Sequence, residues 1–184
     1  NQPLTAILAN ARAAQRFLAQ ENPDLKEVHE ILQDIVNDDK RAGEVISGLR
    51  LLLKKGEMER QSIEINAIVS EVLRLMRSDL LNSSVIANIE LAPGLPNAYA
   101  DRVQVQQVLI NLIANACEAM SEVVASSRQL IVRTALTVER EICVSVSDMG
   151  TGISDRNLSR LFDPFFTTKR NGLGLGLAVC RTIL

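Results

Sequence analysis

The sequence has no hydrophobic run that approaches the ~20 residues needed to cross a lipid bilayer. Its first residues carry no signal-peptide pattern. The formal net charge is only −2 at pH 7, which argues against nucleic acid or an anionic membrane surface as the main partner. Internal repeats and low-complexity tracts are also missing. These absences predict a cytoplasmic globular segment that makes no contact with a membrane.

Cysteine and histidine are scarce. The cysteines, Cys117, Cys143 and Cys180, lie far apart and each has apolar neighbours in the sequence, so we expect buried, reduced thiols rather than a disulfide framework or a metal site. The single histidine, His29, lies beside the apolar seam of an expected helix, and we expect it to be a solvated surface residue.

The chain begins with the pattern of two amphipathic helices. Apolar residues recur at helical spacing from the first residues, Pro23 prevents that helix from continuing, and Asp24 can cap a second helix over about 25–55. One helical hairpin is too thin to bury its own apolar face. We therefore expect residues 1–56 to form a four-helix bundle with a second copy. Packing against the rest of the same chain is the alternative.

The pattern changes after a charged, glycine-containing break, which predicts a linker at 57–61. Helices segregated from mostly antiparallel strands predict an α/β sandwich of the α+β class over residues 62–184. The periodicity of the sequence predicts strands at 62–66, 85–91, 130–138 and 140–148, and helices at 67–81 and 101–120.

Glycines open the last apolar helix. The stretch NGLGLGLAV, residues 171–179, places Gly172, Gly174 and Gly176 at its start. Backbone N–H groups are free at a helix N-terminus and the helix dipole adds positive potential, so such a turn can bind phosphate. A turn that merely caps the helix is the alternative. It is not a P-loop, because no Lys-Ser/Thr pair follows the last glycine.

A second glycine turn follows a predicted strand. Asp148 ends this strand, and Gly150 and Gly152 lie in the turn behind it. A carboxylate here can accept a hydrogen bond from the exocyclic amine of adenine, whereas guanine presents a carbonyl at that point, so the site would prefer ATP to GTP. The alternative is an Asx turn, in which Asp148 accepts a hydrogen bond from its own backbone.

Two asparagines, Asn111 and Asn115, share one face of the helix predicted at 101–120. Buried amides are costly unless they find partners. Hydrogen bonds to another helix are one interpretation. The other is a magnesium site, because Mg²⁺ prefers hard oxygen ligands and a neutral amide oxygen does not repel a triphosphate.

Four motifs, in this order and at these separations, resemble the conserved boxes of bacterial sensor histidine kinases. NLIANACEAM, DMGTGI, LFDPFFTTK and NGLGLGL resemble the N box, the first glycine box, the F box and the second glycine box. NQPLTAIL resembles the end of the phosphoacceptor box, which reads His-Glu-x-Asn-Gln-Pro-Leu, a variant shared with oxygen-sensing and other PAS-linked kinases. The resemblance implies a dimerisation and phosphotransfer hairpin over 1–56 and a GHKL-type catalytic ATP-binding domain over 62–184.

The resemblance also implies the site residues. Asn115 would ligate Mg²⁺, Asn111 would lie beside the phosphates, and Asp148 would bind the adenine amine. Lys169, in a lid over about residues 154–171, would reach the phosphates. The remaining implied residues are Gly150 and Gly152 in the adenine wall, Phe162, Phe165 and Phe166 as lid anchors that act by packing, and Gly172, Gly174 and Gly176 beside the triphosphate.

The implied activity is that of a kinase transmitter. It would bind Mg-ATP, phosphorylate a histidine expected three residues before Asn1, and pass the phosphoryl group to an aspartate in the receiver domain of a response regulator. On this interpretation both ends of the chain are cut from a longer one, because the histidine precedes Asn1 and the last strands of the domain follow Leu184. The alternatives are a GHKL ATPase that drives conformational change and a kinase-dead dimeric scaffold that binds a response regulator.

Overall fold

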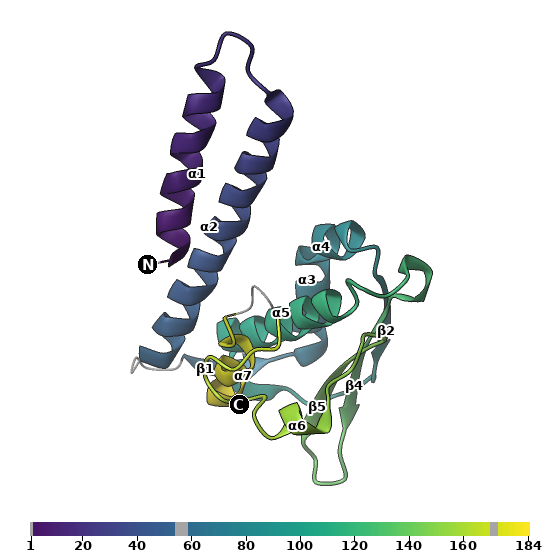
Figure 1. Cartoon of the computed structure of the whole chain (residues 1–184). Coiled ribbons are helices and arrows are strands. Elements are labelled where there is room, and N and C mark those ends of the chain that lie inside the picture. The colour runs from purple at the N-terminus through teal and green to yellow at the C-terminus, as the bar shows by residue number, and fades with distance from the viewer. Residues whose placement is uncertain (1, 54–58, 170–172) are drawn as a thin grey trace.

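The computed structural model describes residues 2–53, 59–169 and 173–184. A hairpin of two long helices, α1 (Gln2–Leu18) and α2 (Leu25–Leu53), projects from a mixed α/β body (Figure 1). Oδ1 of Asp24 accepts hydrogen bonds from the backbone N–H groups of Lys26 and Glu27 at 3.0 and 3.2 Å, which confirms the expected cap of α2. His29 is exposed, as expected.

Among the residues that the structure describes, the body contains two small sheets. One is the antiparallel pair β1–β3, and the other has the order β2–β4–β5, with β2 parallel to β4 and β4 antiparallel to β5. The α+β class is therefore confirmed. The elements of the body are β1 (Arg60–Ile63), α3 (Ile65–Leu75), α4 (Arg77–Asn82), β2 (Ile86–Leu91), β3 (Ala98–Asp101), α5 (Arg102–Ala119), a 3₁₀ turn (Ala125–Ser127), β4 (Gln129–Leu136), β5 (Ile142–Asp148), α6 (Asp155–Leu158) and α7 (Gly176–Ile183).

Helix α5 supplies the platform of the body. Oδ1 of Asp101 caps it by accepting from the N–H groups of Val103 and Gln104 at 2.9 and 3.2 Å. Its inner face packs into the main core through Ile113, which is 1% exposed. The fully buried side chains of this core come from α3, from α5 with its C-cap residue, and from β4: Ile68, Val69, Val72, Ile113, Met120, Leu130 and Val132.

Several predicted elements have different bounds. The strand expected at 62–66 is β1, which begins at Arg60 and gives way to α3 at Ile65, so the expected linker at 57–61 overlaps a strand; residues 57 and 58 lie outside the described residues. The helix expected at 67–81 divides at Met76 into α3 and α4. Strand β3 has only four residues and pairs with β1, so no local alternation indicates it.

The expectation of three buried cysteines is wrong for Cys143, which is exposed on β5. Alternation along a strand, rather than apolar neighbours in the sequence, decides which face a side chain occupies. Cys180 is buried and Cys117 is half-buried. Burial raises the pKa of both thiols, and the charge of Asp79 raises the pKa of Cys117 further. Within the described residues, no helix is long and apolar enough to cross a membrane.

Candidate functional site

The predicted motifs meet around one cavity of about 750 Å³. The cavity is lined by residues of α5, of the segment after β5 and of the start of α7. Gly43 of α2 also lines the cavity, so the helical hairpin contributes to its wall. The predicted residues that line it are Asn111, Asn115, Gly152, Phe166, Lys169, Gly174 and Gly176, whereas Gly172 lies outside the described residues.

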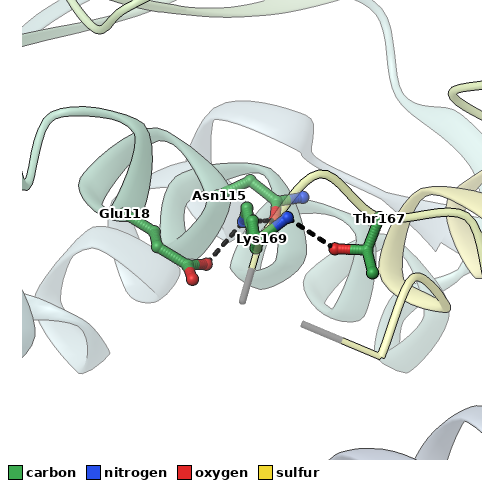
Figure 2. Close-up of polar contacts among 4 residues, drawn as sticks. All are labelled: Asn115, Glu118, Thr167 and Lys169. Carbon is green, nitrogen blue, oxygen red and sulfur yellow. Dashed lines mark hydrogen bonds and ion pairs between the residues drawn. The ribbon is translucent and has the colours of Figure 1, made fainter. Parts of the chain in front are cut away.

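Asn115 and Lys169 are in direct contact inside this cavity (Figure 2). Nζ of Lys169 donates to Oδ1 of Asn115 at 2.8 Å and lies 2.5 Å from Oε2 of Glu118, which follows Asn115 by one helical turn. The backbone N–H of Lys169 donates to Oγ1 of Thr167 at 3.1 Å. An amide oxygen and a carboxylate oxygen therefore converge on one cation.

These two oxygens fit a Mg²⁺ ion that is bound together with a nucleotide better than a metal site made only of protein ligands. Both oxygens are hard ligands of the kind that Mg²⁺ prefers. Among the described residues, no cluster of three or more His, Cys, Asp or Glu side chains could hold a metal ion. A Mg²⁺ ion at Asn115 would need further oxygens from phosphates and water, which is its usual coordination in phosphoryl-transfer sites.

Glu118 was missed by the sequence analysis. The motif NACEAM contains it, and the spacing of three residues from Asn115 on a helix places both side chains on one face. That spacing was the available signal.

Asn111 joins α5 to α7. Its Nδ2 donates to the carbonyl oxygen of Gly176 at 3.4 Å and lies 3.8 Å from Sγ of Cys180, while its Oδ1 accepts from Nε2 of Gln107 at 3.1 Å. The helix–helix interpretation of this residue is thus observed. Its place beside the phosphates stays a prediction. Because the bond to Gly176 holds the start of α7, Asn111 fixes the glycine turn against the cavity.

Gly174 has a conformation that other residues rarely adopt, with φ of +66°. Its carbonyl oxygen accepts from the N–H of Phe165 at 2.9 Å. A Cβ atom at Gly174 would lie 2.4 Å from the carbonyl oxygen of Phe166. The lid can approach the start of α7 this closely only because residue 174 has no side chain.

The lid phenylalanines differ from one another. Phe166 lines the cavity, and the guanidinium of Arg160 lies 4.4 Å from its ring centroid. Phe162 is 44% exposed, with Arg181 5.8 Å from its ring centroid. The expectation that Phe165 anchors the lid by packing is wrong in this conformation, because its side chain is 69% exposed. Phe165 holds the lid through its backbone bond to Gly174 instead.

Asp148 is exposed and forms the Asx turn that was the alternative to an adenine contact: its Oδ1 accepts from the N–H of Gly150 at 2.8 Å. It does not line the cavity, whereas Gly152 does. A Cβ atom at Gly150 would lie 2.6 Å from Oδ1 of Asp148 and 2.8 Å from Cβ of Ala119. Gly150 therefore lets the turn lie directly against the end of α5, and the adenine contact stays a prediction.

Comparisons with known proteins agree with these motifs. Residues 100–184 match the family described as histidine kinase-, DNA gyrase B- and HSP90-like ATPases. The chain is 36% identical over its whole length to the sensor histidine kinase TmoS of Ectopseudomonas mendocina, but spans only 19% of that protein.

Solved structures give the same picture. The catalytic domain of histidine kinase ThkA is 33% identical, with a TM-score of 0.60 over 68% of this chain and 80% of that domain. A larger ThkA structure, in complex with the response regulator TrrA, covers the whole chain and 51% of ThkA with a TM-score of 0.74. At 24% identity, that second likeness shows the fold alone, for the hairpin and the body together.

Proposed function

We propose that this chain, which belongs to the bacterial sensor histidine kinases and contains their GHKL-type ATP-binding domain, binds Mg-ATP in the cavity beside α5. We propose further that it transfers the γ-phosphoryl group of this ATP to a histidine. The acceptor is expected three residues before Asn1, and an aspartate of a response regulator takes the phosphoryl group from it. The observation that carries the proposal is the convergence of Asn115, Lys169 and Gly174 on one cavity.

Each of these residues has a physical role in the proposal. Mg²⁺, when bound, neutralises phosphate charge. Asn115 would hold this ion through Oδ1, and Lys169 would bind phosphate oxygens as a point charge. The start of α7 lines the cavity, and the N–H groups that a helix N-terminus leaves free would favour an anion there. The residues thus orient the triphosphate and compensate its charge, which is the main protein contribution to phosphoryl transfer.

Asn111 favours a kinase over an ATPase. A neutral amide has no basicity near neutral pH and cannot take a proton from an attacking water. Both ends of this amide already have partners, Gln107 and the carbonyl of Gly176. The site therefore lacks a base at this position, which suits a γ-phosphoryl group that must wait for a histidine. The intact cavity disfavours a kinase-dead scaffold.

Replacing Asp148 by asparagine tests the nucleotide site. Asparagine keeps an oxygen for the Asx turn to Gly150 but replaces the second oxygen by an amide NH₂ group, which cannot accept a hydrogen bond from adenine. We expect Asp148→Asn to leave the melting temperature without nucleotide nearly unchanged, to remove most of the rise caused by Mg-ATP, and to weaken the preference for ATP over GTP. Thermal denaturation with each nucleotide measures this. If Mg-ATP raised the melting temperature of the variant as much as that of the wild type, Asp148 would have a role in the turn and none in binding adenine.

We also propose that residues 1–56 pair with a second copy to form a four-helix bundle. The support is a set of leucine and valine side chains on the hairpin that are about half exposed or more, which a single hairpin cannot bury. These are Leu4, Leu8, Leu18, Leu25, Leu32 and Val36. The proposed whole is a cytoplasmic homodimer that has a response regulator as its partner.

A Leu8→Lys substitution should weaken this dimer by about a hundredfold or more. Twofold symmetry places the change on both protomers, and each buried leucine contributes roughly 1.5–3 kcal/mol. Light scattering across a dilution series measures the dissociation constant. Leu81→Lys is the matched control, because Leu81 is 67% exposed on α4, outside the hairpin. Equal dimerisation of the Leu8 variant and the wild type would contradict the bundle.

A further inference from the structure

The contact between the lid and α5 has the form of a latch made of three residues. Nζ of Lys169 reaches across the cavity to two oxygens of α5, at 2.8 Å from Asn115 and 2.5 Å from Glu118 (Figure 2). The Lys169 side chain is 32% exposed, so this ion pair is partly shielded from water. The N–H of Lys169 is also held by Thr167. Lys169 thus has defined partners for both its ammonium group and its backbone N–H.

The geometry points to a cation exchange at Asn115: we propose that, before Mg-ATP binds, the Lys169 ammonium occupies the position of the metal, held there by Glu118, and that Mg²⁺ displaces it and releases the lid lysine to the phosphates. This inference rests on the proposed function, because it takes Asn115 as the ligand of Mg²⁺. It adds a positioning residue, Glu118, and a reason for the Mg²⁺ ion to control the lid.

Mg²⁺ and Lys169 compete because they need the same oxygen. Mg²⁺ binds oxygen at about 2.0–2.1 Å, whereas Nζ of Lys169 lies 2.8 Å from Oδ1 of Asn115. Even on separate lone pairs of that oxygen, the two cations would lie only about 4 Å apart, where like charges repel strongly. Phosphate oxygens carry more negative charge than an amide, so the displaced ammonium has a better partner once the triphosphate is present.

Glu118 has two effects in this arrangement. Its carboxylate draws Lys169 toward α5, and the ammonium in turn neutralises a negative charge in the cavity that would otherwise repel a triphosphate. ATP without Mg²⁺ must break the ion pair between Lys169 and Glu118 with no second cation to replace the ammonium. Mg-ATP brings a divalent cation to the same oxygens, so Glu118 stays neutralised after Lys169 leaves.

The closing experiment compares Glu118→Gln with Glu90→Gln in the full chain. Glu90 forms a similar ion pair with Arg133 at 2.6 Å, outside the cavity, and serves as the matched control. The first measurement is the rate of trypsin cleavage after Lys169 without nucleotide, because the protease must extract this side chain from its partners. We expect the rate to rise about two- to fivefold in Glu118→Gln, the size expected for one partly exposed ion pair, and to stay at the wild-type value in Glu90→Gln.

The second measurement is calorimetric affinity for ATP in EDTA and for ATP with Mg²⁺, with Lys169→Met as the background of a double-mutant cycle. We expect Glu118→Gln to tighten binding of ATP in EDTA by about two- to fivefold, and by less when Mg²⁺ is present. The gain should also be smaller when Lys169 is methionine, because only the repulsion between Glu118 and the triphosphate is then removed. An equal gain with and without Lys169 would show simple repulsion by Glu118 and overturn the latch, as would unchanged trypsin cleavage. Failure of the wild type to bind Mg-ATP would instead sink the proposed function, and the trypsin measurement would still report on the latch.

Discussion

An Asn115→Ala variant should lose about two orders of magnitude or more in the rate of phosphohistidine formation from Mg-ATP. The protein for this experiment is the chain extended upstream through the histidine expected three residues before Asn1. A metal ion that compensates phosphate charge supplies several kcal/mol, and each 1.36 kcal/mol changes a rate tenfold. Acid-labile label from γ-labelled ATP measures the phosphohistidine.

Two variants keep this experiment specific. Asn97→Ala removes an exposed amide that donates to Oγ of Ser62 at 2.9 Å; neither residue lines the cavity, and the variant should keep the wild-type rate. His29→Ala should also keep it, because His29 is exposed on α2 and is not the expected acceptor. Loss of label in the His29 variant would overturn the assignment of the acceptor, and a wild-type rate in Asn115→Ala would remove Asn115 from the metal site.

Gly174→Ala should lower the affinity for Mg-ATP by at least about tenfold. Alanine at a φ of +66° costs roughly 1–2 kcal/mol by itself. The added Cβ atom would also lie 2.4 Å from the carbonyl oxygen of Phe166 and 2.5 Å from the carbonyl carbon of Phe165, so backbone must move. That movement separates the lid from the start of α7. Calorimetric titration with a non-hydrolysable ATP analogue measures the affinity.

Gly94→Ala separates strain from collision. Gly94 has a φ of +69°, but a Cβ atom there meets no atom within 4 Å, and the residue does not line the cavity. This control should lose some thermal stability and keep its affinity for the nucleotide. Wild-type affinity in Gly174→Ala would mean that the contact between the lid and α7 has no part in nucleotide binding.

The parts of the site that depend on local chemistry are readable from the sequence. A glycine turn before an apolar helix and two asparagines spaced by one helical turn can both be recognised, because each depends only on residues that are close in the sequence. Asp24 and Asp101 likewise mark the starts of α2 and α5, and both caps are present. For the same reason the strand hairpin of β4 and β5 was predicted nearly at its observed bounds.

Features that depend on distant partners are not readable in this way. Strand β3 exists because it pairs with β1, which lies more than thirty residues earlier. The latch joins Lys169 to Glu118 across fifty-one positions. Phe165 shows a further limit: the family resemblance implies an aromatic anchor that packs, but the side chain of Phe165 is 69% exposed and its backbone makes the contact with Gly174. Exposure of Cys143 follows from strand alternation, which the apolar neighbours concealed.

The position of Gly43 in the cavity wall has a thermodynamic consequence. Because a residue of the hairpin lines the same cavity as Asn115, we expect a displacement of α2 to change the affinity of the cavity for nucleotide. Such coupling is reciprocal: if a shift of α2 changes the affinity for ATP by some factor, ATP biases that shift of α2 by the same factor. A signal that shifts the helices of the hairpin would therefore change the affinity for nucleotide. Conversely, binding of nucleotide would change the equilibrium position of these helices, also at the far end of the hairpin.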